Sequence, residues 1–471
     1  MCSPVPYNST MKVTFLLYGF CLFSANALDS KDAVITISSQ SNNYHYLLAE
    51  NLKNDILKQA RDFDQVVPIV HVSHIDFPHV GGWAILPLIP YLRKLHHGNC
   101  SWFFFMEDKT RIRLKKLIEV LGKYDYNKEI WLGHAIQDRE ATIIHHFAFF
   151  EDPSAFKYPN AASGFAISAA LMERLENRWK ARKPSTSDFS IDYAHELALF
   201  IWDNNKGPTL KHDPSFCVNE ESSCASFPVP FKLCYTSVPK SSIYFAVKTY
   251  EKFHKDRVTV VKNTWGKHAE FINFFSNVED KSVPTISVGV PNTEQGHCEK
   301  TLAILKHVGE DLRKFPSIKW IVLADDDTIL SVTRIQELLS CYDNNSLIAI
   351  GERYGYNIYN KNGYNYITGG GGIVFTSALL RQLISSKICK CPTISSPDDM
   401  FLGVCLNRLK VDITHSSLFH QARPMDYAPE YLENQPVVSF HKHWMIDPVS
   451  IYIKWFADAD ASIRSLQHSE L

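Results

Sequence analysis

The chain has 471 residues, of which 45% are hydrophobic and 21% are charged, so it can bury a core, and its length favours two domains over one. Its formal net charge of -1 excludes attachment to nucleic acid or to an anionic membrane through overall charge. We therefore expect no nucleic-acid partner, and any basic site must be local.

Both ends of the chain carry sorting signals. Lys12 precedes an apolar run, Val13–Phe23, and the small residues up to Ala27 follow it, which is typical of a cleaved secretory signal. The run of about 11 residues is too short to cross a bilayer of roughly 30 Å. Residues 1–27 are therefore predicted to be a signal peptide, with no membrane span in the mature chain. The last residues, 468–471 (HSEL), resemble a retention signal, which predicts a soluble protein of the endoplasmic reticulum lumen.

The two halves of the chain share an internal repeat. Three pairs of segments align in the same order: Trp102–Thr110 with Trp320–Thr328, Ile130–Gly133 with Ile348–Gly351, and Gly164–Leu171 with Gly372–Leu379. Collinear matches of this kind indicate duplication of one structural unit. Each half alternates buried strands with amphipathic helices, which predicts an α/β fold with a mostly parallel, Rossmann-like sheet covered on both faces.

These patterns divide the chain into two tandem domains. Residues 28–205 are predicted to form a degenerate, non-catalytic domain, and 241–467 the catalytic domain. The segment 206–240 is rich in Pro, Ser and Cys and lacks periodicity, so it is predicted to be the linker. In the second half, four elements are expected: strands at 242–246, 285–290 and 320–324 and a helix at 298–312.

Three acids follow the central strand of the second half. Ile321–Ala324 leads directly into Asp325, Asp326 and Asp327, at the sheet edge where open α/β proteins bind ligands. Adjacent carboxylates repel one another, and a divalent cation such as Mg²⁺ or Mn²⁺ is the simplest compensation. A solvated acidic turn is the alternative, but the buried strand and the repeat favour a metal site.

The first half carries a changed copy of this triplet. There it is Glu107, Asp108 and Lys109, and a lysine ammonium at the third position would take the place of the cation. We therefore predict that this half has lost the metal. Two roles stay open for it, positioning a protein substrate or a purely structural one.

Two further motifs of the second half are candidate site segments. Four glycines, Gly369–Gly372, would let the backbone approach a sugar or phosphate, although a flexible loop is the alternative and the spacing is not a Rossmann fingerprint. Asp398 and Asp399 begin a predicted helix, where Asp398 is expected to cap the free N–H groups. Asp399 is then the candidate general base.

Histidines and cysteines complete the candidate groups. His420 is the candidate third metal ligand and His441 is the alternative, although isolated histidines are often structural. Removal of the signal peptide leaves an odd number of the 11 cysteines, so at least one thiol is unpaired. The cysteines at 217, 224, 234, 389 and 391 are expected to form disulfides rather than a zinc site, because no tetrahedral ligand spacing accompanies them. Their connectivity stays open.

The chain resembles family 31 of the glycosyltransferases, which includes Fringe, over essentially the whole mature sequence. The matching segments are Phe245–Thr249, Phe253–Arg257, Pro291–Thr293 with Gly296–Cys298, Asp325–Thr328, Gly351–Tyr356, the four glycines, Pro397–Met400 and Phe419–Pro424.

This resemblance implies a GT-A fold in both domains, Mn²⁺ or Mg²⁺ as metal and UDP-glucose as donor. It implies an inverting transfer that forms a β-1,3 bond to O-linked fucose on folded thrombospondin type 1 repeats. It implies that Asp325 and Asp327 bracket the metal and the donor and that Asp399 is the catalytic base. The predicted metal ligands are thus Asp325, Asp327 and His420, and the residues predicted to bind the nucleotide sugar are Asp325, Asp326, Lys248, Thr249, Arg257, Gly370 and Gly371.

Two alternatives remain at this stage. One is a Fringe-like transferase with another donor sugar, galactose or N-acetylglucosamine, because donor choice depends on a few pocket contacts. The other is a glycoprotein-binding module without catalysis, which the intact acid triplet argues against.

Overall fold

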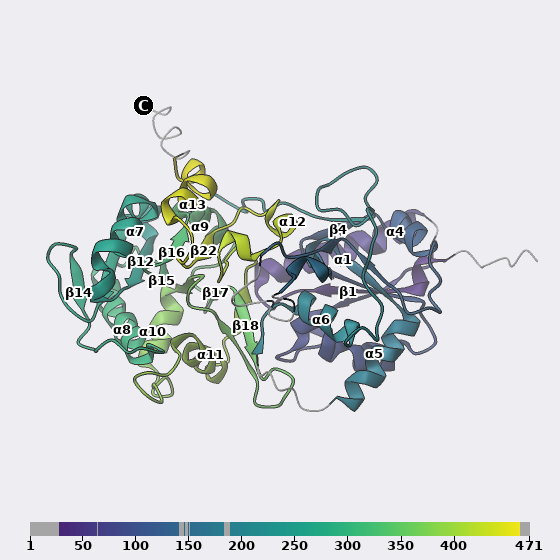
Figure 1. Cartoon of the computed structure of the whole chain (residues 1–471), viewed down its shortest axis with the longest axis horizontal. Coiled ribbons are helices and arrows are strands. Elements are labelled where there is room, and N and C mark those ends of the chain that lie inside the picture. Colours follow the sequence, from purple (N-terminus) through teal and green to yellow (C-terminus); the bar gives the residue numbers. More distant parts are fainter. Residues whose placement is uncertain are drawn as a thin grey trace, which may run out of the picture.

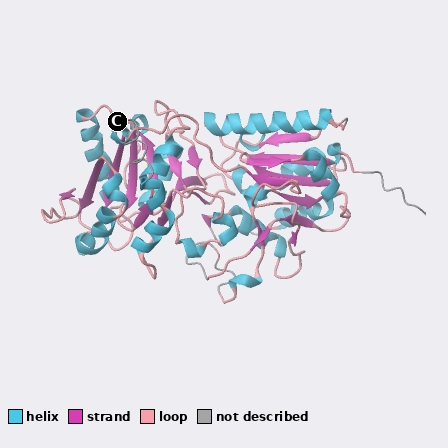
Figure 2. Ribbon diagram, turned by 90° about the horizontal axis from the view of Figure 1, so that it is seen from above, coloured by secondary structure: helices cyan, strands magenta, loops and turns pink. Residues whose placement is uncertain are grey.

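The computed structural model describes residues 28–63, 65–140, 146, 149, 151–182 and 189–461. The predicted signal peptide (1–27) and the retention-like tail (468–471) lie outside these residues. The described chain forms two α/β units side by side, each with its own sheet (Figure 1; Figure 2). Among the described residues, no helix is both long and apolar enough to cross a membrane.

The first unit is built on a six-stranded sheet in the order β10-β5-β8-β3-β1-β2. Its strands are parallel except β8, which runs antiparallel to both neighbours. The strands are β1 (Ala33–Ser38), β2 (Ile69–Val72), β3 (Trp102–Glu107), β5 (Trp131–Gly133), β8 (Phe165–Ser168) and β10 (Lys211–His212). The helices are α1 (Asn43–Asp62), α2 (Ser73–Asp76), α3 (Ile89–His96), α4 (Leu114–Leu121), α5 (Ala169–Ala181) and α6 (Tyr193–Trp202).

The second unit is built on a seven-stranded sheet in the order β14-β13-β12-β15-β20-β17-β21, in which β20 is antiparallel to its neighbours. The strands are β12 (Ile243–Lys248), β13 (Phe271–Ser276), β14 (Thr285–Ser287), β15 (Trp320–Asp325), β17 (Ala349–Gly351), β20 (Ile373–Thr376) and β21 (Ile413–His415). The helices are α7 (Thr259–Asn263), α8 (Cys298–Lys314), α9 (Val332–Leu339), α10 (Ser377–Ser385), α11 (Asp398–Arg408), α12 (Pro429–Leu432) and α13 (Pro448–Trp455).

The two sheets have the same topology. Strands β2-β1-β3-β8-β5-β10 correspond in order and direction to β13-β12-β15-β20-β17-β21, and β14 is an added edge strand. The three aligned sequence segments fall on matching elements, with β3 on β15, β5 on β17 and β8 on β20. The predicted α/β fold class with two mostly parallel sheets is confirmed.

The central strands are apolar on both sides because two separate cores cover the two faces of each sheet. In β15, Trp320 and Val322 pack into one core, whereas Ile321 and Leu323 pack into the other. In β3, Phe103 likewise packs into one core, whereas its neighbours Trp102 and Phe104 pack into the other. This double burial explains why the strands are uninterrupted apolar runs rather than alternating ones.

Part of the segment predicted to be a linker belongs to the first unit. Lys211–His212 is the edge strand of its sheet, and β11 (Ser226–Pro228) pairs with β4 (Thr110–Ile112). The corresponding pair in the second unit is β16 (Thr328–Leu330) with β22 (Ser439–His441). Strands this short carry too few residues to show a period in the sequence.

Small sheets join and complete the units. β18 (Arg353–Tyr356) pairs with β19 (Tyr364–Ile367) and also with β9 (Phe189–Ser190) from the first unit, so that a three-stranded sheet crosses the domain boundary. A further pair joins β6 (Ala135–Ile136) and β7 (Tyr158–Pro159).

The predicted disulfides are present, with connectivities that the sequence left open. They are Cys217–Cys224, Cys234–Cys341, Cys298–Cys391 and Cys389–Cys405, and Cys100 is the free thiol among the described cysteines. Cys389 and Cys391 therefore have different partners. Cys405 lies within α11 and Cys298 begins α8, so two bridges tie the loop before α11 to both helices.

Candidate active site

The acid triplet lies at the carboxyl end of β15, as its position after a buried strand predicts. Asp325 is the last residue of β15, and Asp326 and Asp327 form the turn into β16. The turn is fixed by Thr328, whose hydroxyl accepts a hydrogen bond from the Asp325 N–H at 3.0 Å and donates one to the Gly370 carbonyl at 2.8 Å. The triplet and the glycine run are thus held together.

Lys248 connects the triplet to the start of α11. It ends β12 directly beside Asp325, and its Nζ lies 3.0 Å from Asp325 Oδ1 and 2.6 Å from Asp398 Oδ2. Burial alone would raise the pKa of Asp398, but Lys248 and a hydrogen bond from Thr301 lower it to about 2. Asp398 is therefore an ionised anchor for α11.

The prediction that the Asp398 side chain caps the helix is wrong. The cap position is Pro397, which has no side-chain cap bond, and Asp398 is the first helical residue. The carboxylate instead accepts hydrogen bonds from Lys248 and from the Thr301 hydroxyl, both at 2.6 Å. The sequence could not reveal this pairing, because the partners come from β12 and α8.

Three side chains offer ligand atoms for a cation. One atom each from Asp325, Asp327 and His441 lies within 4.8 Å of the other two. His441 Nε2 is 3.1 Å from Asp327 Oδ1, while its Nδ1 is 3.1 Å from the Gln421 carbonyl oxygen. Burial opposes protonation of His441, but Asp327 and Asp325 outweigh it and raise its pKa, so that without a metal Nε2–H pairs with Asp327. When Nε2 binds a metal it would give up this proton, and the carbonyl at Nδ1 would hold the other one, which is the usual arrangement of a histidine ligand. Two carboxylates and one imidazole fit a divalent cation such as Mn²⁺.

His441, rather than His420, is the histidine beside the carboxylates. Strand β22 pairs with β16 so that His441 lies opposite Thr328. His420 packs against the rings of Phe440 and Tyr427, with centroid distances of 5.2 and 4.7 Å. The geometry therefore favours His441 over His420 as the third metal ligand.

Gly370 is needed for His441 to reach the acids. A Cβ built on Gly370 would lie 2.3 Å from two atoms of the His441 ring, so a side chain there would displace the imidazole. Gly371 offers its N–H to Gln421 Oε1 at 3.0 Å. In this structure the glycine run serves close packing around the acid site.

The remaining predicted donor-site residues surround Asp326. The Thr249 hydroxyl donates to Asp326 Oδ2 at 2.6 Å, and Arg257 Nη1 lies 3.1 Å from Asp326 Oδ1 and 2.8 Å from Asp327 Oδ2. Burial and the neighbouring Asp327 raise the pKa of Asp326 to about 6. Burial also opposes ionisation of Asp327, but His441 and Arg257 outweigh it and lower its pKa. Asp327 is therefore ionised at neutral pH.

Asp399 has the properties of a proton acceptor. It is half-buried at the start of α11, where its Oδ1 accepts the Met400 N–H at 2.7 Å. Burial and the charge of Asp398 raise its pKa to about 6. A base with a pKa near the working pH transfers protons efficiently.

The first-unit copy of the triplet has become part of the domain interface. Asp108 Oδ2 lies 2.7 Å from His45 Nδ1, and His45 Nε2 lies 3.3 Å from the Tyr342 hydroxyl of the second unit. Lys109 is directed to the Tyr44 ring, 5.7 Å from its centroid, and forms no salt bridge with a described residue. It does not replace a cation in the way that the sequence suggested.

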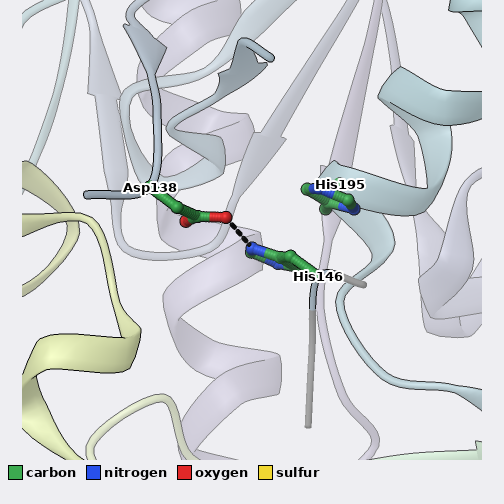
Figure 3. A group of neighbouring side chains, drawn as sticks. All are labelled: Asp138, His146 and His195. Carbon is green, nitrogen blue, oxygen red and sulfur yellow. Dashed lines mark hydrogen bonds and ion pairs between the residues drawn. The ribbon is translucent and has the colours of Figure 1, made fainter. Parts of the chain in front are cut away.

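A second group of side chains, Asp138, His146 and His195 of the first unit, also has metal-ligand chemistry (Figure 3). However, Asp138 already binds His146 at 2.6 Å and the Tyr158 hydroxyl at 2.6 Å, and His146 Nε2 lies 3.1 Å from Asp192. The rings of His146 and His195 are stacked 3.7 Å apart with 4° between their planes. A ring nitrogen binds a metal in the plane of its ring, so parallel rings cannot both bind one ion. This group is a buried ion-pair cluster.

This cluster predicts a pH-dependent stability. Burial alone would lower the pKa of His146, but Asp138 and Asp192 outweigh it and raise the pKa to about 9. Its stabilisation is complete below the ordinary pKa of about 6.5 and is lost as the pH rises through about 9. His146→Asn should therefore lower stability by roughly 1–3 kcal/mol at pH 6.5 and by much less at pH 9.5. Thermal unfolding across this range tests it, and a difference that is independent of pH would contradict it.

Comparison of the sequence with known proteins identifies the chain as a glycosyltransferase. Residues 88–195 and 238–462 match the family model described as Fringe-like, and the chain belongs to this family. It is 48% identical over 437 residues to human beta-1,3-glucosyltransferase, covering 92% of this chain and 87% of that protein. It is 26% identical over 220 residues to chicken (Gallus gallus) beta-1,3-N-acetylglucosaminyltransferase lunatic fringe, covering 42% of this chain and 59% of that one. The chain is therefore a hexosyltransferase.

Among solved structures, the chain resembles the galactosyltransferase LgtC in complex with donor and acceptor sugar analogues. The TM-score is 0.27 at 13% sequence identity, and the match covers 46% of this chain and 95% of that one.

Proposed function

We propose that the protein transfers glucose from UDP-glucose to O-linked fucose on folded thrombospondin type 1 repeats and forms a β-1,3 bond with inversion at the anomeric carbon. The observation that carries the proposal is the convergence of Asp325, Asp327 and His441 at one sheet edge, joined through Lys248 to the helix that bears Asp399. The 48% identity to a human beta-1,3-glucosyltransferase supports the transferred sugar and the linkage.

The donor diphosphate is proposed to bind beside the acid triplet. Asp325, Asp327 and His441 would hold a divalent cation, which supplies Lewis-acid neutralisation of the charge on the leaving UDP. Arg257 lies 2.8 Å from Asp327 with its side chain 30% exposed, so it can also face a phosphate. Lys248, held between two carboxylates, positions Asp325 relative to α11.

Asp399 is proposed to activate the acceptor. Its ionised carboxylate accepts the proton of the fucose 3-hydroxyl, and the hydroxyl oxygen attacks the anomeric carbon of glucose as the bond to UDP breaks. A single displacement places the new bond on the opposite face of the sugar, which inverts the configuration. One proton moves to Asp399, and the electron pair of the broken bond leaves with UDP.

The proposal includes location and domain roles. Residues 1–27 would direct the chain into the endoplasmic reticulum and 468–471 would retain it there. The first unit would have no transfer activity of its own, since Asp108 of its triplet is paired with His45 and Lys109 lies over the Tyr44 ring. Removal of 468–471 should increase secretion of the protein, and an unchanged cell-to-medium ratio would argue against a retention signal.

The experiment that tests the function is incubation of the protein with UDP-glucose, Mn²⁺ and a folded repeat carrying O-fucose. The mass of the repeat should increase by one hexose, and a chelator should prevent the increase. UDP-galactose and UDP-N-acetylglucosamine are compared in parallel, because the similarity to lunatic fringe favours N-acetylglucosamine as the alternative donor. Transfer with either of these sugars but not with glucose would replace the proposed donor.

The raised pKa of Asp399 predicts the pH profile of transfer. Because the base must be ionised, kcat/KM should level off above its pKa of about 6 and fall up to tenfold per pH unit below it. The profile is measured between pH 5 and 8 at saturating metal and donor, which removes effects of pH on metal binding. A constant kcat/KM from pH 5 to 7 would contradict a base with this pKa.

A further inference from the structure

A groove of about 270 Å³ lies between the two units, apart from the acid site. The first-unit wall contains Gln40, Phe77, Val80 and Trp83, and the second-unit wall contains Arg353, Asn365 and Asn407. Hydrogen bonds across the boundary fix its width: the Trp83 indole N–H donates to Asn365 Oδ1 at 2.9 Å, and Gln40 Nε2 donates to the His415 carbonyl at 2.9 Å. The two walls therefore form one preformed site.

The groove is lined by an arginine whose hydrogen bonds are incomplete. The guanidinium carbon of Arg353 is 4.4 Å from the centroid of the Trp83 ring. Its Nε is buried without a hydrogen-bond partner. Glu107 attracts the guanidinium, but no salt bridge joins Arg353 to a described residue. A desolvated guanidinium that donates fewer hydrogen bonds than it can is costly unless a ligand completes them. Carbonyl or carboxylate oxygens of a bound chain would do so.

Two exposed tyrosines of the first unit do not line the groove themselves but contact residues that do, and we call this pair the rim. Tyr91 is 52% exposed, and its ring lies 5.5 Å from that of His79 and 6.4 Å from that of Phe77. Tyr46 is 40% exposed, and the centroid of its ring lies 5.9 Å from that of the His74 ring. Aromatic residues and arginine are enriched at protein-binding surfaces, and this groove with its rim contains both.

The groove has a fixed position relative to the proposed base. Asn407 lies on α11 about two turns after Asp399, which is about 12 Å along the helix axis. That distance corresponds to three to four residues of extended chain. An acceptor sugar at Asp399 would therefore have the polypeptide that carries it within reach of the groove.

The segment that supplies Trp83 is held in a strained conformation. Ile85 has φ 59°, which a β-branched residue rarely adopts. Gly82 is closely packed, since a Cβ there would lie 2.8 Å from the Phe77 carbonyl oxygen. Strain of this kind persists where the surrounding structure enforces it, and it is concentrated at binding sites.

We propose that this interdomain groove binds the polypeptide of the glycoprotein acceptor, so that the first unit selects the acceptor protein. The inference rests on the proposed transfer to a glycoprotein. It gives the first unit a binding role, with Arg353 and Trp83 lining the groove and Tyr46 and Tyr91 at the rim.

The test compares two double variants in transfer to a fucosylated repeat. The first is Tyr46→Ala with Tyr91→Ala at the rim. The matched control is Tyr126→Ala with Tyr235→Ala, two exposed tyrosines that, unlike the rim pair, have no ring contact with a residue lining the groove. The rim variant should raise KM for the repeat by at least about tenfold with little change in kcat. The control should leave both constants unchanged. Val80→Glu, which places a charge at the mouth, should raise KM in the same way.

A second measurement uses the same repeat without fucose. It should inhibit transfer competitively in the wild type, because it offers the polypeptide alone, and the rim variant should lose this inhibition. Unchanged KM in both groove variants, or no inhibition of the wild type, would overturn the inference. Calorimetry of the unfucosylated repeat without donor separates the two proposals. Groove-dependent binding without transfer of any sugar would reject the proposed function alone, whereas transfer without groove-dependent binding would reject the groove alone.

Discussion

Asp399→Asn is expected to abolish glycosyl transfer while leaving binding of UDP and metal unchanged. Asparagine has nearly the same shape as aspartate but cannot accept the proton of the attacking hydroxyl, and loss of a general base typically costs 10²- to 10⁴-fold in rate. The donor-binding groups Asp327, His441 and Arg257 do not contact Asp399. The measurements are kcat for transfer to a fucosylated repeat and the calorimetric affinity for UDP with Mn²⁺.

The same variant should be at least as stable as the wild type. Because the pKa of Asp399 is raised in the folded protein, its ionised form destabilises the fold above about pH 6, and asparagine removes that cost. A lower melting temperature at pH 7 would mean that lost activity reports misfolding. Turnover at the wild-type rate would remove Asp399 from the mechanism.

Asp327→Ala is expected to eliminate metal-dependent binding of UDP. Its carboxylate lies 3.1 Å from His441 Nε2 and 2.8 Å from Arg257 Nη1, so its loss removes one proposed ligand and releases two cationic neighbours. The affinity for UDP in the presence of Mn²⁺ should fall at least 100-fold, to the value measured with a chelator. Calorimetry with and without metal measures this, and UDP affinity that still depends on Mn²⁺ would assign the cation to other residues.

Asp108→Ala is the matched control in the first unit. Transfer per folded molecule should be unchanged, because Asp108 belongs to the copy without a metal site. The variant should be less stable, since Asp108 is 5% exposed and its loss leaves His45 buried without its 2.7 Å partner. A large fall in kcat for a fully folded Asp108→Ala protein would contradict a non-catalytic first unit.

The sequence was sufficient to predict the long, doubly buried elements. The expected strands near 242–246 and 320–324 and the helix at 298–312 correspond to β12, β15 and α8, because extended apolar runs and clear helical periods determine them locally. β13 was not identified, although Phe271, Phe274 and Phe275 mark it as a strand. Strands β10 and β11 could not be identified, because two or three residues carry no period and their pairing partners are remote in sequence.

The sequence was sufficient to predict those site residues that have metal-binding side chains and directly follow a recognisable strand. Asp325 and Asp327 follow a recognisable strand, but His420 and His441 are equivalent by residue type alone, and only the pairing of β22 with β16 distinguishes them. The bridge from Lys248 to Asp398 depends on tertiary packing. Trp83 gave no signal in the sequence, and Arg353 appeared only as part of the matching segment Gly351–Tyr356, because their contact across the domain boundary depends on tertiary packing.

The two disulfides around α11 have a consequence for how the protein matures. Cys405 within the helix is bonded to Cys389, and Cys391, two residues further on, is bonded to Cys298 at the start of α8. The segment that leads to Asp399 is thereby cross-linked on both sides. Protein produced in a reducing cytosol would lack these two disulfides. Oxidation of the four cysteines is therefore also an assembly step for the segment that carries the proposed base, and recombinant preparations need an oxidising host.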